Sequence, residues 1–157
     1  MATKRGKQAP KAFESFLFEV MSPSPYYSFG LAHRPDDLDP YSEHPSWKIE
    51  ARCLHPARFA GRIAQFTVLG DRRLMAEMRD RGAFTSGPLG VGMMDADKNR
   101  FTVYATLPLD GLWAMGAALA SGSVRYVATH GPRLVRGKAL VRDIRFEGNS
   151  LELADWA

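Results

Sequence analysis

Six side chains that can ligate a divalent cation lie in one stretch of the chain, residues 33–44. They are His33, Asp36, Asp37, Asp39, Glu43 and His44. Imidazole nitrogens and carboxylate oxygens of this kind could hold a metal ion for a metal-assisted hydrolase. No H-x-x-x-H pattern on a helix is present to fix the ligands in direction. We therefore expect a solvated acidic loop and no cofactor, and keep the metal-assisted hydrolase as the alternative function.

Cys53 and His55 are two residues apart in a segment that alternates like a strand, so their side chains should share one face. An imidazole beside the thiol could lower its pKa and create a nucleophile. The same alternation groups Cys53 with Ile49 and Ala51 on the apolar face, where a free cysteine is a small hydrophobic residue. We expect a buried, unreactive thiol.

The last part of the chain, residues 124–146, predicts a hairpin that turns on Gly131-Pro132. This register places Arg125 opposite Lys138 and beside Arg136. Like charges directly opposed on paired strands cost a few tenths to about 1 kcal/mol, so the stripe favours an anionic partner. An alternative is that acidic residues 36–43 cover the stripe, or that water screens it. The predicted partner-binding residues are Arg125, Arg136, Lys138 and Arg142.

The chain length of 157 residues is that of one domain. Its single cysteine excludes an internal disulfide and fits a reducing compartment. The formal net charge is +4, and residues 1–12 carry four basic residues without an acidic one. We expect a disordered basic tail over residues 1–12 and a single domain over residues 13–157.

Period-two alternation predicts strands over residues 15–20, 48–54, 62–69, 89–94 and 100–107, besides the last hairpin. Asp71 and Asp110 could cap two short helices that end at Gly82 and Gly122. Short connections favour antiparallel pairing. The expected fold is α+β, mainly an antiparallel sheet of about seven strands with two short helices. The alternative architecture is a β-sandwich with two inserted helices.

Residues 22–46 contain five prolines, which argue against a helix or a central strand. We expect a long loop, and long loops in compact domains are often functional.

These features favour a non-enzymatic binding or assembly module that presents the basic face of its last hairpin, with help from the N-terminal tail, to a nucleic acid or an acidic protein. A third interpretation is an accessory subunit that docks or oligomerises through aromatic anchors. These anchors would be Tyr26, Tyr27, Trp47 and Trp156. No apolar stretch reaches the roughly 20 residues of a membrane helix, and no secretion signal is evident, so we expect a cytoplasmic protein.

Overall fold

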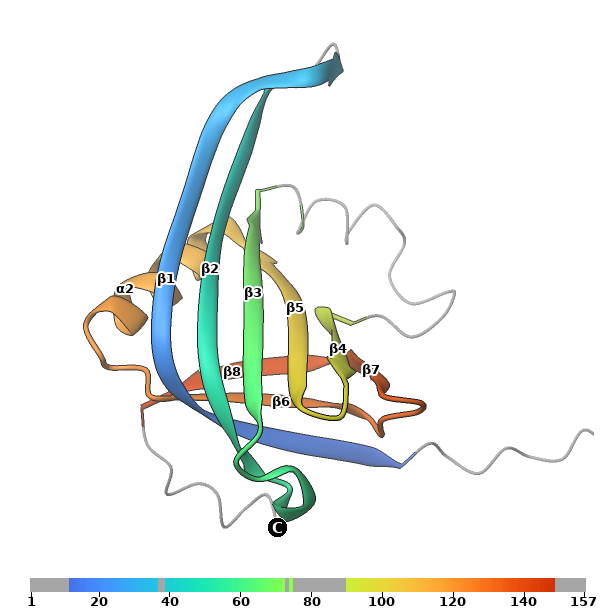
Figure 1. Ribbon diagram of the computed structural model, residues 1–157. Coiled ribbons are helices and arrows are strands. Elements are labelled where there is room, and N and C mark those ends of the chain that lie inside the picture. The colour runs from blue at the N-terminus through green and yellow to red at the C-terminus, as the bar shows by residue number, and fades with distance from the viewer. Residues whose placement is uncertain (1–11, 37–38, 73, 75–89, 149–157) are drawn as a thin grey trace, which may run out of the picture.

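The computed structural model describes residues 12–36, 39–72, 74 and 90–148. Eight strands and the helix α2 account for most of these residues (Figure 1). The elements are β1 (Phe13–Asp36), β2 (Asp39–His55), a 3-10 turn (Ala57–Phe59), β3 (Ile63–Asp71), β4 (Gly92–Ala96), β5 (Arg100–Pro108), α2 (Leu109–Ala120), β6 (Tyr126–Pro132), β7 (Lys138–Val141) and β8 (Asp143–Glu147).

All eight strands belong to one sheet, in the order β7-β4-β5-β3-β2-β1-β6-β8. The prediction of a sheet-rich domain is confirmed in this coarse form, and the β-sandwich is wrong for the described residues. The sheet is mixed, because β3 and β5 pair in parallel. Although β3 and β4 are consecutive in the chain, they are not neighbours: β4 lies on the far side of β5, so β5 pairs with β3 after a crossover.

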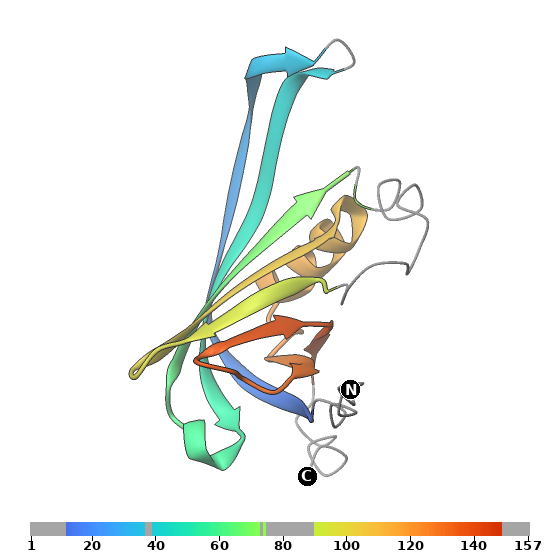
Figure 2. The same cartoon turned by 90° about the vertical axis from the view of Figure 1, so that its right-hand side faces the viewer.

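The sheet curls until its two ends meet. β7 and β8 follow each other along the chain, and β7 pairs with β4 while β8 pairs with β6. A hydrogen bond from the backbone N of Arg142 to the carbonyl of His130, 2.9 Å long, ties the two ends together. Figure 2 shows β6, β7 and β8 folded across the lower part of the sheet. The inner face is thereby enclosed.

The enclosed core follows the predicted alternation. Ile49, Ala51 and Cys53 of β2 are buried, as are Ala64, Phe66 and Val68 of β3 and Phe101, Val103 and Ala105 of β5. Phenylalanines from several strands make edge-to-face contacts at its centre, with ring centroids 5.1–5.7 Å apart. Such pairs stabilise a core by about 0.5–1.5 kcal/mol beyond area burial.

Helix α2 buries the predicted stripe of Leu112, Met115, Gly116 and Leu119 against the sheet. It begins two residues earlier than expected, with Pro108 as N-cap, so Asp110 lies in the first turn rather than at the cap. Gly122 has a φ of +72° and ends the helix as predicted. Residues 75–81 of the other predicted helix lie outside the described residues, and Asp71 is the last residue of β3.

The predicted loop at 22–46 is wrong, because this segment forms a long two-stranded arm of β1 and β2 (Figures 1 and 2). After Val20, β1 no longer pairs with β6. On the other side of the arm, β2 pairs with β3 only from Ser46 onward. Prolines are tolerated on such free edges because no ladder hydrogen bond is lost there. Pro23 and Pro25 occupy the free part of β1.

In the described part of the chain, helices are too short or too polar to cross a membrane.

Candidate functional site

The register predicted for the last hairpin is wrong. The chain continues as β6 through Gly131 and Pro132 and turns instead at Arg136 and Gly137, whose φ angles are +51° and +78°. Two consecutive left-handed residues are typical of a tight hairpin turn, here closed by the Val135–Lys138 bridge. The partners across β6 and β8 are therefore Tyr126 with Glu147 and His130 with Asp143.

This register separates the four predicted partner-binding residues. The guanidinium of Arg125 lies 5.9 Å from the ring centre of Tyr126, at one end of β6. Arg136 occupies the tight turn. Lys138 pairs with Asp95 at 3.9 Å, an exposed contact of little energetic value. Arg142 lies at the opposite end of β6 from Arg125, so the continuous basic stripe of the prediction does not form.

Arg142 instead joins an exposed stack at the start of β1. Its guanidinium carbon lies 5.5 Å from the ring centre of Phe13. The same ring stacks on the imidazole of His130, with centroids 5.3 Å apart and planes 9° from parallel. Phe13 remains 52% exposed. We call Phe13, His130, Arg133 and Arg142 the Phe13 platform.

Neighbouring backbone and side-chain contacts hold the platform in place. The hydroxyl of Ser15 and Nδ1 of His130 are 2.8 Å apart and share a hydrogen bond. The backbone N of Arg133 donates to the carbonyl of Ala12 at 2.8 Å. The basic residues Lys4, Arg5, Lys7 and Lys11 precede Ala12 in the sequence. The chain that carries these four charges thus joins the fold at Arg133.

Some of the described arginines have a carboxylate partner and others do not, both in this region and elsewhere: Arg145 of β8 is paired, whereas Arg62 and Arg100 outside the hairpin are not. Carboxylates engage Arg52, Arg58, Arg72 and Arg145. Within residues 12–36, 39–72 and 90–148, no carboxylate pairs with Arg125, Arg133, Arg136 or Arg142. The nearest acidic residue of β1, Glu14, pairs with Arg58, away from the platform. Among the described residues, four guanidinium groups along the last hairpin are therefore free of a carboxylate partner.

Asp97, beside the tight turn, does not neutralise Arg136 either. Its carboxylate accepts hydrogen bonds from the backbone N–H groups of Asn99 and Arg100, both 2.8 Å long. These hydrogen bonds lower the pKa of Asp97. The carboxylate of Asp97 therefore stabilises the turn between β4 and β5.

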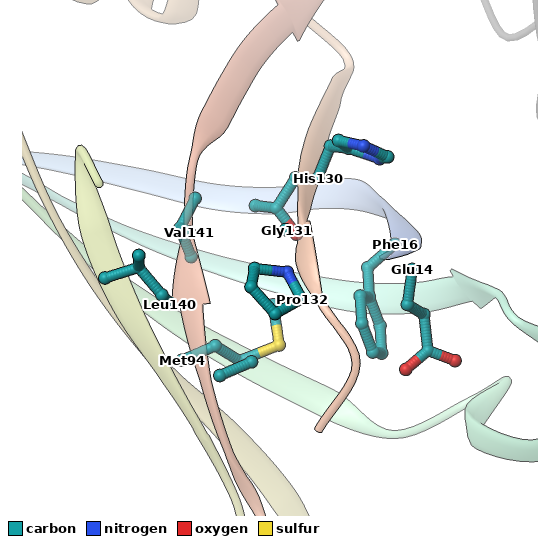
Figure 3. A pocket seen from close by; sticks show the side chains of 10 residues that line it. Glu14, Phe16, Met94, His130, Gly131, Pro132, Leu140 and Val141 are labelled. Atoms are coloured by element: carbon teal, nitrogen blue, oxygen red, sulfur yellow. The ribbon is translucent and has the colours of Figure 1, made fainter. Parts of the chain in front are cut away.

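A small pocket lies behind the platform, where the ends of the sheet meet (Figure 3). Phe16, Met94 and Val141 line it, and the imidazole of His130 is directed away from them. The pocket volume is about 10 Å³, which is room for about one water molecule. Ligand sites usually measure about 300–1,000 Å³. This pocket is too small for a substrate, so we place the candidate site on the surface.

The residues considered as metal ligands do not come together where the structure describes them. Glu43 accepts a hydrogen bond from the hydroxyl of Tyr27 at 3.1 Å and pairs with Arg72. His44 is the next residue on the strand, so its side chain lies on the opposite face of the arm. The side chains of His33, Asp36, Asp37 and Asp39 lie outside the description.

Cys53 is buried, as predicted, and its thiol donates to the backbone carbonyl of His55 at 3.3 Å rather than to the imidazole. Burial raises the pKa of the thiol from 9.0 to about 11. We expect a maleimide to modify Cys53 in the native protein at least about a thousandfold more slowly than in urea, because the folded state must open first. The stability contributed by the protonated thiol should be fully present below pH 9 and lost as the pH rises through about 11. Rapid native modification would contradict this assignment.

The sequence analysis did not select Phe13, His130 or Arg133 as candidate site residues. The sequence does hold one signal for this site, because the aromatic residue Phe13 directly follows the basic segment 1–12. Comparison of the chain with protein-family models, with curated proteins and with solved structures yields no match.

Proposed function

We propose that this protein is a non-enzymatic binding module that holds a single-stranded nucleic acid on the Phe13 platform. The observation that carries the proposal is that no carboxylate of the described residues pairs with Arg133 or Arg142, which lie at the half-exposed ring of Phe13. Proteins that bind single strands combine cationic groups for the phosphates with flat side chains for the bases.

The platform supplies both kinds of contact. The ring of Phe13 and the guanidinium of Arg142 are flat surfaces on which a base can stack, an interaction worth about 1–3 kcal/mol per base. Arg133 and the basic residues before Ala12 can neutralise phosphates on one side, and Arg136 and Arg125 can do so farther along the hairpin. An acidic protein would use the arginines but would gain less from the exposed ring. The lone buried cysteine supports a cytoplasmic setting.

Anisotropy of a labelled 12-nucleotide single strand tests the proposal. We expect Arg142→Glu and Phe13→Ala each to weaken binding about tenfold, since each removes about 1.4 kcal/mol or more of contact energy. Lys48→Glu is the matched control. It alters the net charge as much as Arg142→Glu does, at an exposed β2 position whose β1 partner, Ser24, is eleven residues along the strand from Phe13.

An equal loss of affinity in Lys48→Glu would show that net charge alone attracts the strand, and the platform would be excluded. Binding that survives both platform substitutions would exclude it too. If an acidic peptide binds in a manner sensitive to Arg142→Glu while single strands do not bind, the partner class is protein and the nucleic-acid proposal is wrong.

A further inference from the structure

The two faces of the arm differ sharply in character. Tyr27, Phe29 and Leu31 project from β1 on the same face as the buried Ile49 and Trp47 of β2. The opposite face carries small polar residues. These are Ser22, Ser24, Ser28, Gly30 and Ser42, with Tyr26 and His44 among them. The core face of the sheet thus continues along the arm.

Helix α2 covers this face only near the body of the protein. Trp113 of α2 contacts Tyr27, with ring centroids 6.0 Å apart, and the arm extends beyond the helix (Figures 1 and 2). Past this contact, Phe29 is 59% and Leu31 is 75% exposed. Phe29 stacks on Tyr41 across the arm at 5.3 Å. The result is a contiguous exposed apolar surface, and such surfaces mark interaction sites.

We propose that this face, together with Trp113, is the contact through which two copies of the chain associate. A buried aromatic side chain accounts for about 150–250 Å², so the half-exposed rings and Leu31 offer on the order of 500 Å² per copy. A two-fold contact buries the same patch twice, about 1,000 Å² in total, which is the lower bound of about 1,000 Å² for a biological interface.

The charges on the face fit a second copy better than a charged partner. Among the side chains that the structure describes on the arm, Glu43 carries the acidic group of this face, and Arg72 and the hydroxyl of Tyr27 already engage it. Over the described part of the arm, two identical faces can therefore meet without like-charge repulsion, whereas an acidic or basic partner would find no free counter-charge among Tyr27, Phe29 and Leu31.

The prolines direct the contact to the face rather than the edge. Pro23 and Pro25 stand on the free part of β1, and Pro45 lies on β2 beyond its pairing with β3. Proline lacks the N–H that an added strand would need, which is a common protection of open edges. Association through the apolar side chains remains open.

Sedimentation velocity of the full chain tests this inference. We expect the mass of two chains for the unaltered protein and of one chain for the double variant Phe29→Asp, Leu31→Asp. The matched control is Ser28→Asp, Gly30→Asp, which places the same two charges one residue away, on the opposite face. It should remain a dimer. A monomeric unaltered protein, or a control that dissociates as fully as the arm-face variant, would overturn the inference.

Cross-linking gives a second test that does not depend on added charge. Cys53 is buried, so Phe29→Cys or Gly30→Cys provides one reactive thiol per chain. A short bis-maleimide should link two copies of Phe29→Cys and leave Gly30→Cys as single chains; the reverse result, or no linkage in either, would overturn the inference. Because the arm and the Phe13 platform are separate surfaces, the monomeric variant should still bind a single strand if the proposed function holds.

Discussion

Replacement of Phe101 by alanine is expected to lower the free energy of unfolding by about 3–5 kcal/mol. Phe101 is fully buried and makes edge-to-face contacts with Phe16, Phe18 and Phe59, at centroid distances of 5.7, 5.6 and 5.3 Å. Its ring joins β5 to β1 across the enclosed core. Truncation leaves a cavity walled by rigid rings, which collapse poorly, so the upper part of the range applies.

Urea denaturation provides the measurement, with Tyr104→Ala as control. Tyr104 lies on the same strand but is 55% exposed on the outer face, so its loss should cost well under 1 kcal/mol. Since whole domains are stable by about 5–15 kcal/mol, Phe101→Ala is at risk of unfolding, and Phe101→Leu supplies a milder variant. A loss below 1 kcal/mol for Phe101→Ala would contradict the enclosed core.

Gly131→Ala is expected to destabilise the protein by about 1–3 kcal/mol or more, because Gly131 lies where β6 and β7 meet and close the sheet. A Cβ added at Gly131 would lie 2.0 Å from the carbonyl oxygen of Leu140. Backbone cannot yield as a flexible side chain can, so β7 must move away from β6. That movement also strains the hydrogen bond from Arg142 to His130, and nucleic-acid binding should weaken with it.

Gly111→Ala is the control of opposite sign. No atom lies within 4 Å of a Cβ built at Gly111, which is in helix α2. Alanine should there gain up to about 1 kcal/mol in helix propensity. Thermal melting of the two variants gives the comparison. If Gly131→Ala melts at the temperature of the unaltered protein, the two ends of the sheet do not meet as described.

The core strands were predictable because their signal is local. In β2 and β5 one face is buried and the other exposed, so Ile49, Ala51 and Cys53, or Phe101, Val103 and Ala105, reveal the inward face by alternation alone. The stripe of α2 is equally local. The parallel pairing of β3 with β5 has no local signal, because it depends on which strands pack together after a crossover.

The arm and the last turn were missed for identifiable reasons. Residues 22–31 largely alternate between small polar and large apolar side chains, which is typical of a strand. The prolines in this segment argued against a strand. A strand tolerates proline where its edge is unpaired, and only the fold shows that this edge of β1 is unpaired. The turn at Arg136 and Gly137 requires an arginine in the left-handed region, whereas Gly131-Pro132 offered a more common turn sequence. The platform then followed from the corrected register, which brings His130 and Arg142 to Phe13.

Photocrosslinking of a halogen-substituted single strand, followed by mapping of the modified peptides, tests the proposed function most directly. Exposed aromatic rings occur on both the platform and the arm, and the method reports which of them a base contacts. We expect crosslinks within residues 13–15 and 130–133, reduced in Arg142→Glu. Crosslinks confined to Tyr27, Phe29 or Tyr41 of the arm, or none above those formed by an unrelated protein, would contradict the assignment of the Phe13 platform as the binding site.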